Sequence, residues 1–201
     1  VALEQCTFSD NRAGERGGAL WCGGSDAELR QCIFWGDSAP LGGELSVEGL
    51  VWPPTPSWIR ISKSCLQGGA EGIGLGNDLG NLEATELLPN APGFRRPGGW
   101  TDPGTPADPT DDTWSPGDYR LAACSPCIDR AETSASDHDL DGQSRPQEGD
   151  GVPPARGDLG AWEFVADTVR DSDADGMTDA DEAAAGTDPL DPADCFRIKS
   201  L

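Results

Sequence analysis

The sequence LEQCTF at residues 3–8 returns as LRQCIF at residues 29–34, 26 positions later. A second pair of segments keeps nearly the same spacing, since GGAL at 17–20 returns as GGEL at 42–45. A third and weaker copy, ISKSCL at 61–66, follows a proline-rich insertion at 51–58. Internal repeats of this period are typical of solenoids, in which each repeat forms one coil.

Each copy contains short stretches of alternating pattern that are broken by Gly, Asn and Asp turns, as expected for strands. One coil of this length cannot bury its own apolar face, so neighbouring coils must stack. Stacking predicts two ladders of apolar side chains, Leu3–Leu29–Ile61 and Phe8–Phe34–Leu66. Such ladders form a narrow continuous core, which explains how a chain with only 36% hydrophobic residues can fold.

The pattern L-x-x-C-x-F, followed by a polar turn and G-G-x-L, resembles the right-handed parallel β-helix repeat of pectate-lyase-like proteins. The segments at 33–38 and 64–69 are similar to the last coils of large bacterial surface β-helix proteins. This resemblance implies an all-β chain whose residues 1–69 are β-helix coils. An antiparallel β-sandwich with chance repeats is the alternative fold.

Residues 70–116 have little periodicity and are rich in Gly and Pro, so we expect an irregular excursion over the end of the solenoid, anchored by 87–88 and Phe94. Four tryptophans fall in or beside such loops: Trp52, Trp58, Trp100 and Trp114. They serve either to cover the open coil end or to stack on sugars.

An ordered set of motifs occupies residues 117–165: GDYRL (117–121), SPCID (125–129), DLDGQSRP (139–146) and GDLGAWE (157–163). The set resembles the choice-of-anchor segment that closes β-helices in exported bacterial proteins, which implies a closing segment here. The chain departs from that pattern by an additional cysteine, Cys124, and by Leu159 in place of isoleucine.

Within this set, Asp137, Asp139 and Asp141 with Gly142 imitate the opening of a calcium loop, but Arg145 brings a positive charge to the ninth position. A turn hydrogen-bonded by its own Asp side chains and a second calcium site are the two interpretations. His138 is expected to be an exposed loop residue.

The sequence DSDADGMTDADE at 171–182 matches the calcium-loop pattern D-x-[DN]-x-[DN]-G-x5-E at every specified position. The expected ligands are the carboxylates of Asp171, Asp173 and Asp175, the carbonyl of Met177, Asp179 through water, and both oxygens of Glu182. The alternative is a solvated acidic linker, but acidity alone explains neither the glycine at the sixth position nor the glutamate at the twelfth.

The flanks of this loop do not predict an EF-hand, because residues 164–170 are too short for a helix and 179–185 can form barely two turns. Gly186 would end that helix, and Pro189 would prevent its continuation. The stretch 171–194 resembles the bacterial thrombospondin type 3 repeat, which implies a calcium-binding stiff connector at 167–194 with Asp188 and Asp191 as further ligands. Residues 195–201 alternate like the first strand of a further domain.

The formal net charge of −22 argues against nucleic acid and anionic membranes as partners. No stretch is apolar for long enough to predict membrane insertion, and residues 1–4 do not resemble the start of a signal peptide. An extracellular, calcium-rich location suits this composition.

The chain contains seven cysteines: Cys6, Cys22, Cys32, Cys65, Cys124, Cys127 and Cys195. The CxxC at 124–127 has no second pair beside it, so zinc is not expected. A local disulfide or two separately buried thiols remain open there, and at least one cysteine should stay free or pair outside this chain.

Candidate catalytic groups are scattered over the repeats: Asp10, Arg12, Glu15, Arg16, Asp37 and Glu44. We interpret them as solvated turn residues, and a Ser/His/Asp or Cys/His arrangement has only His138 to draw on. We therefore expect no catalytic residue in this chain. The predicted role is a non-catalytic structural or adhesive β-helix fragment joined by a calcium-stabilised linker to an anchoring or further domain, with surface glycans or other proteins as partners. The alternatives are the non-catalytic end of a secreted polysaccharide lyase or glycoside hydrolase, and a pure spacer.

Overall fold

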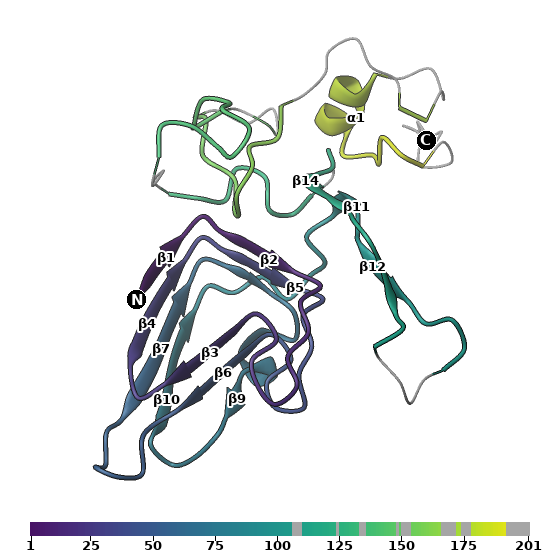
Figure 1. Cartoon of the computed structure of the whole chain (residues 1–201). Coiled ribbons are helices and arrows are strands. Elements are labelled where there is room, and N and C mark those ends of the chain that lie inside the picture. Colours follow the sequence, from purple (N-terminus) through teal and green to yellow (C-terminus); the bar gives the residue numbers. More distant parts are fainter. Residues whose placement is uncertain are drawn as a thin grey trace, which may run out of the picture.

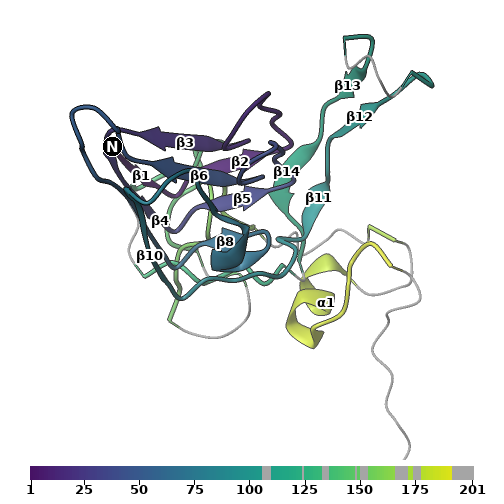
Figure 2. The same cartoon turned by 90° about the horizontal axis from the view of Figure 1, so that it is seen from below.

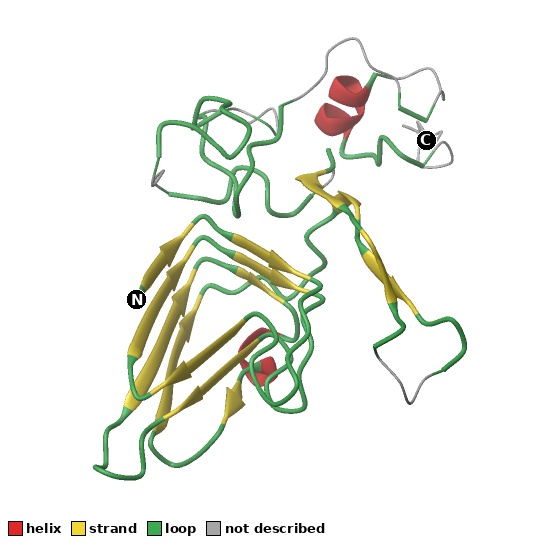
Figure 3. Cartoon of the chain, in the orientation of Figure 1, coloured by secondary structure: helices red, strands yellow, loops and turns green. Residues whose placement is uncertain are grey.

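The computed structural model describes residues 1–105, 110–123, 125–132, 136–147, 149, 154–165, 172–173 and 178–191. Strands dominate the described part of the chain (Figures 1 and 3). The strands are β1 (Ala2–Glu4), β2 (Thr7–Ser9), β3 (Leu20–Gly23), β4 (Asp26–Arg30), β5 (Ile33–Trp35), β6 (Leu45–Glu48), β7 (Ser57–Ser62), β8 (Cys65–Leu66), β9 (Gly74–Leu75), β10 (Gly80–Thr85), β11 (Phe94–Arg96), β12 (Gly99–Thr101), β13 (Thr113–Ser115) and β14 (Asp118–Leu121). A 3-10 helix, η1 (Gly69–Gly72), and an α-helix, α1 (Asp179–Ala185), complete the described elements.

The first ten strands form a β-solenoid of about three turns. Its three parallel sheets have the strand orders β1-β4-β7-β10, β2-β5-β8 and β3-β6-β9. Figure 1 shows these sheets as the walls of the stacked coils. The prediction of an all-β solenoid is confirmed, and the parallel pairing excludes the antiparallel sandwich for this part of the chain.

The register between coils confirms both predicted ladders. Leu29 pairs with Leu3 on one side and with Ile61 on the other. In the next sheet Phe34 lies between Phe8 and Leu66. The side chains of Leu29 and Phe34 are fully buried, so the ladders form the core of the solenoid.

The corner between the first two sheets has the same two-residue length in successive coils. It begins at Gln5, Gln31 and Lys63, each with a left-handed backbone at φ 49°, 54° and 48°. Glu86, with φ 53°, repeats this conformation after β10. Non-glycine residues rarely adopt positive φ, so its recurrence at the same position shows that each coil turns with the same backbone conformation.

The repeated G-G-x-L motif has a local explanation. Gly17 and Gly42 both have positive φ, 57° and 61°, and a side chain at either position would collide with the carbonyl group of the following leucine, Leu20 or Leu45. Only glycine combines this backbone conformation with so close an approach.

The solenoid continues beyond residue 69, where we expected the coils to end. Strands β9 and β10 extend two of the sheets, with Leu82 opposite Ile59 and Ala84 opposite Ile61. These strands were not predicted because Gly, Asn and Asp are frequent here, and because β10 has only two inward apolar residues, Leu82 and Ala84. The expected irregular excursion therefore begins after β10.

That excursion forms an antiparallel ribbon. Strand β11 pairs with β14, and β12 with β13 (Figure 2). In the second pair Trp100 lies opposite Trp114. Trp100 Nε1 donates a hydrogen bond to the carbonyl of Asp10 at 3.3 Å, and the Arg12 guanidinium lies 4.7 Å from the Trp100 ring centre. Trp100 thus contacts a corner of the first coil.

The closing segment, residues 117–165, packs on the outward face of the β2-β5-β8 sheet. Ile33 and Cys65 point away from the ladders and join a second core with residues of this segment. The buried members from the closing segment are Leu121, Cys127, Ile128, Ala131, Leu159 and Phe164. The sheet is thereby covered on both faces. Within the described residues, no helix is both long enough and apolar enough to cross a membrane.

Candidate calcium site and the neighbouring polar network

Helix α1 follows the acidic loop, as the sequence predicted. Thr178 caps its N-terminus by accepting a hydrogen bond from the Asp181 N–H at 3.2 Å. Gly186 ends the helix in the left-handed conformation at φ 75°. Acidic side chains in the first turn favour this helix because its N-terminus carries a partial positive charge.

The structure describes only part of the predicted ligand set. Asp173, Asp179 and Glu182 lie within it, as do the further candidates Asp188 and Asp191. Asp171, Asp175 and Met177 fall outside the described residues, so their expected roles stay predictions.

Asp179 ties the start of the loop to the start of the helix. Its two carboxylate oxygens accept hydrogen bonds from Ser172, one from the backbone N–H at 2.8 Å and one from the hydroxyl at 2.7 Å. These bonds hold Ser172 against the first residue of the helix. The role of Asp179 as a ligand through water stays a prediction.

Glu182, the twelfth residue of the loop, has a fully buried side chain. Thr187 contacts it from beyond the helix, with its N–H bonded to the Glu182 carbonyl at 3.0 Å and its hydroxyl 3.5 Å from Oε1. Burying a carboxylate is costly unless cations or hydrogen bonds compensate the charge. A buried glutamate among aspartates offers the hard oxygen ligands that calcium prefers, so the described residues fit this ion.

The repeat contacts the rest of the protein. A cavity of about 220 Å³ lies between Ser172, Asp179 and Leu190 on one side and the β11-β14 pair on the other. Arg95, Arg96, Asp118 and Phe164 contribute to the second wall. Ala183 of α1 also packs against the second core, so the helix is seated on the body of the protein.

A buried acid organises the closing segment. Asp158 is 1% exposed, and its two oxygens accept hydrogen bonds from the N–H groups of Asp129 at 2.8 Å and Phe164 at 2.5 Å. Burial raises the pKa of Asp158 to about 8. This residue joins the SPCID and GDLGAWE motifs.

A buried ion pair joins the DLDGQSRP motif to GDLGAWE. Arg145 Nε lies 3.3 Å from Glu163 Oε1, and Arg145 also donates to the Gly160 carbonyl at 2.9 Å. Glu163 accepts from the N–H groups of Asp158 at 2.9 Å and Gln147 at 3.1 Å. Burial raises the pKa of Glu163, and the nearby Arg145 opposes that rise. These bonds join three of the four motifs, and the Arg120–Asp141 ion pair adds the fourth, GDYRL.

The Asp137–Asp141 stretch is a hydrogen-bonded turn, as one of our two interpretations held. Asp139 Oδ1 accepts from the N–H groups of Asp141 at 2.9 Å and Gln143 at 2.7 Å, while Oδ2 accepts from Glu163 N–H. Asp141 pairs with Arg120 at 2.6 Å. The carboxylates of Asp139 and Asp141 are thus bonded to N–H groups and an arginine of the protein itself. His138, which lies beside them, is exposed.

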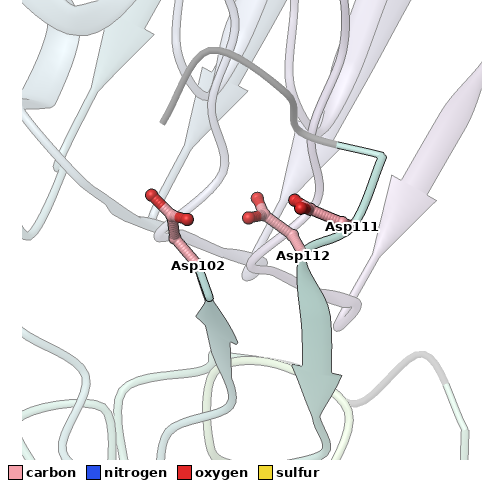
Figure 4. Close-up of side chains that lie close together, drawn as sticks. All are labelled: Asp102, Asp111 and Asp112. Atoms are coloured by element: carbon pink, nitrogen blue, oxygen red, sulfur yellow. The ribbon is translucent and has the colours of Figure 1, made fainter. Parts of the chain in front are cut away.

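A second acidic group, which sequence analysis did not single out, lies at the end of the β12-β13 ribbon. The carboxylates of Asp102, Asp111 and Asp112 lie within 4.8 Å of one another (Figure 4). Asp102 accepts from Gly104 and Thr105 N–H, Asp111 accepts from the Thr105 hydroxyl, and Asp112 pairs with Arg12 at 2.5 Å. The Asp112–Arg12 ion pair attaches this end of the ribbon to the first coil.

Asp37 and Glu44, which we expected to be solvated, are buried. Asp37 Oδ1 accepts two hydrogen bonds from Asn11, both at 2.7 Å. Burial, followed by the hydrogen bond with Asp37, raises the pKa of Glu44 to about 9. Asp37 Oδ2 and Glu44 Oε2 are buried without a hydrogen-bond partner among the described residues, and the raised pKa of Glu44 favours its protonated form at neutral pH.

Comparison with known proteins identifies one segment. A family model described as the bacterial TSP3 repeat matches residues 171–192. Such repeats generally bind calcium, and the match covers both the loop and helix α1. No curated protein matches the chain. No solved structure matches it either.

Proposed function

We propose that this chain is a non-catalytic extracellular structural fragment, in which β-solenoid coils are joined through a calcium-stabilised TSP3 repeat to an anchoring or further domain. Three features support the proposal. They are the solenoid fold, the repeat match at 171–192, and the seating of that repeat on the body of the protein. Surface glycans or other proteins are the partners that such a stalk would present or recognise.

The seating of the repeat is the observation that carries the proposal. A flexible acidic linker would leave α1 exposed on every side. Here Ala183 packs against the second core, and Leu190 lines the cavity beside Arg95 and Arg96. A repeat held in this way would fix the orientation of the following domain relative to the coils.

Calcium would stabilise the repeat because it would compensate the negative charge of the buried Glu182 side chain. With calcium bound, carboxylates at alternate loop positions lose their mutual repulsion, and the loop becomes a stiff element. The affinity expected for an extracellular module is weak, with a Kd on the order of 0.1–1 mM.

The outer face of the β1-β4-β7-β10 sheet supports a structural role over a catalytic one. A hollow of about 370 Å³ on this face is lined by acidic and basic side chains. Arg60 pairs there with Glu83 at 3.2 Å and with Asp26 at 3.6 Å, and Lys63 pairs with Glu86 and Glu132. Neighbouring coils thus neutralise one another, and the proposal places no reaction on this face.

A calcium titration of thermal stability tests the proposal. Calcium at several times its Kd should raise the Tm, because a ligand that binds only the folded state stabilises that state. Glu182→Gln should remove this response. Asp181→Asn is the matched control, since it makes the same charge change at the neighbouring exposed residue and should keep the response.

An identical rise in Tm for the parent and for Glu182→Gln would contradict the proposed site. Rigidity needs a second measurement, namely the distance between a spin label on an exposed coil residue and one on exposed Ala184. We expect calcium to narrow the distribution of that distance. A distribution that stays broad in saturating calcium would contradict the role as a stiff connector.

A further inference from the structure

The cysteines of the coils lie one above another at a fixed corner. Cys6 and Cys32 each follow a left-handed corner residue, Gln5 and Gln31, and each precedes the first residue of its strand. The N–H of Ile33 donates to the carbonyl of Cys6 at 2.9 Å, which fixes the register between the two coils. Cys6 and Cys32 are both free thiols in the structure, and the neighbouring Cys32 thiol is the main cause that lowers the pKa of Cys6.

Parallel strands lie about 4.8 Å apart, so equivalent residues of adjacent coils fall within the Cα separation that a disulfide spans. The two side chains point in the same direction because the coils are in register. A bond between Cys6 and Cys32 thus needs only rotation of the side chains and a small approach of their Cβ atoms.

A second pair of thiols joins the coils to the closing segment. Cys65 begins β8 and points outward, and Cys127 lies in the SPCID turn that covers it. Both side chains are fully buried in the second core, and the neighbouring Cys127 thiol is the main cause that raises the pKa of Cys65. The Cys127 carbonyl accepts from Leu159 N–H at 3.0 Å, which holds the turn against the rest of the closing segment.

We propose that Cys6–Cys32 and Cys65–Cys127 form disulfides, the first linking two coils and the second fastening the closing segment to the third. This inference goes beyond the structural role proposed above and does not depend on calcium. It assigns Cys127 to a partner 62 positions away in the sequence, in place of the local bond to Cys124 that the CxxC spacing suggested.

Cys22 provides an internal comparison. It is buried like Cys32, Cys65 and Cys127, but its thiol donates to the Ser25 carbonyl at 3.0 Å, and Val47 occupies the equivalent position in the next coil. The proposal therefore leaves Cys22 as a thiol.

The chemistry is thiol–disulfide exchange with an external disulfide such as oxidised glutathione. A protein thiolate attacks that disulfide, one glutathione thiolate leaves, and the second protein thiol displaces the other glutathione. Each pair of thiols loses two protons and two electrons, and the electrons convert one glutathione disulfide into two glutathione thiols.

The two pairs differ in their access to this oxidant. Cys6 is half-buried, and the hydrogen bond from Cys32 lowers its pKa to about 6, so its thiolate is available for attack. The hydrogen bond with Cys127, together with burial, raises the pKa of Cys65. The Cys65–Cys127 bond therefore forms before the closing segment covers β8, whereas Cys6–Cys32 can form in the folded protein.

Tryptic mapping tests both bonds directly. The chain is refolded with oxidised and reduced glutathione, its remaining thiols are alkylated, and it is digested without reduction. We expect peptide 1–12 linked to peptide 31–60, and peptide 64–95 linked to peptide 121–130. Peptide 17–30, which contains Cys22, should carry the alkyl group.

The variant Cys124→Ser resolves the two cysteines of peptide 121–130, and the link to 64–95 should persist in it. A bond inside peptide 121–130, or alkylation of Cys65 and Cys127 in the refolded parent, would overturn the second assignment. Alkylation of Cys6 and Cys32 would overturn the first.

A stability measurement separates a true cross-link from a chance link. The Tm of oxidised parent should exceed that of reduced parent by about 5–10 °C. Cys127→Ser should lose the larger part of this difference, whereas Cys22→Ser should keep all of it. An equal difference in parent and Cys127→Ser would contradict the proposed stabilising bond, even if the linked peptides were found. Because these measurements are made in calcium-free buffer, their failure is distinct from failure of the calcium site.

Discussion

The ring of Phe8 lies on the ring of Phe34, 26 residues further along the chain, with centroids 5.1 Å apart and planes within 9° of parallel. This stack exists because adjacent coils are in register. Leu66 continues the same row in the third coil. The separation of the two ring centroids is thus close to the spacing between adjacent coils.

Removing the inner ring should destabilise the whole solenoid. Phe34 is fully buried, so Phe34→Ala should lower the free energy of unfolding by about 3–5 kcal/mol, through lost burial and the cavity that remains. Trp52 is 89% exposed, and Trp52→Ala should change that free energy by less than about 0.5 kcal/mol. Urea unfolding followed by circular dichroism measures both, and equal effects would contradict the ladder as the core.

Stability should fall as the pH rises from mildly acidic to alkaline. The pKa of Glu44 is raised from 4.5 to about 9, so the folded state keeps a proton that the unfolded state releases. This contribution is fully present below pH 4.5 and is lost as the pH rises to 9, at no more than about 1.4 kcal/mol per pH unit. Asp158 acts in the same direction up to about pH 8.

Glu44→Gln isolates the contribution of the acid pair. The amide can donate a hydrogen bond to Asp37 at any pH, so the slope of unfolding free energy against pH between 5 and 8 should become shallower. Asp158 remains intact in this variant and supplies the residual slope. An unchanged slope would show that Glu44 is ionised in the folded protein.

A comparison of two glycines tests how the closing segment docks. Gly160 has φ 85°, and a Cβ there would lie 2.5 Å from Thr7 Oγ1 and 2.8 Å from Ile33 Cδ1. Gly142 has nearly the same φ, 82°, but faces open space. Both alanine variants carry the cost of a left-handed backbone, so the additional loss in Gly160→Ala, expected to be about 1–3 kcal/mol, measures the steric clash alone. Equal losses in the two variants would contradict the docked position.

Removing one partner of the buried Arg145–Glu163 pair should destabilise the protein more than removing the charges of both partners. Arg145→Met leaves Glu163 without its cation and should cost about 3–5 kcal/mol. Adding Glu163→Gln to that variant should restore part of the loss, because the uncompensated charge is then removed. Chemical denaturation of the single and double variants measures this. A double variant less stable than Arg145→Met would show that Glu163 has protein partners worth more than its charge costs.

The sequence was informative where one residue type recurs at one position of the coil. Leu29 and Phe34 could be assigned inward because their counterparts in the other copies are apolar too. Strand β10 was not predicted because Leu82 and Ala84 are its only inward apolar side chains, too few to establish a pattern. Burial of Asp37 and Glu44 could not be foreseen, since acids beside glycine at a corner ordinarily face water, and only the fold brings the two carboxyls together.

In the acidic loop and the closing segment, too, local features could be predicted from the sequence and contacts between distant residues could not. Residue types and spacing predicted helix α1 with its Gly186 cap, because those signals are local. The bonds from Ser172 to Asp179 could not be predicted, and neither could the meeting of Asp158 with Asp129 and Phe164. Such contacts depend on the path of the chain between motifs, and composition does not specify that path.

The invariance of the left-handed corner determines where this architecture tolerates additional sequence. Gln5, Gln31 and Lys63 each begin a two-residue connection, whereas the opposite connection grows from two residues between β3 and β4 to eight between β6 and β7. The longer connection leaves Val51 and Trp52 in solvent while the ladders on either side stay in register. A foreign peptide inserted beside Trp52 would therefore be displayed at the rim of the rod without altering its pitch, which makes that tip the natural grafting point for an epitope or an affinity handle.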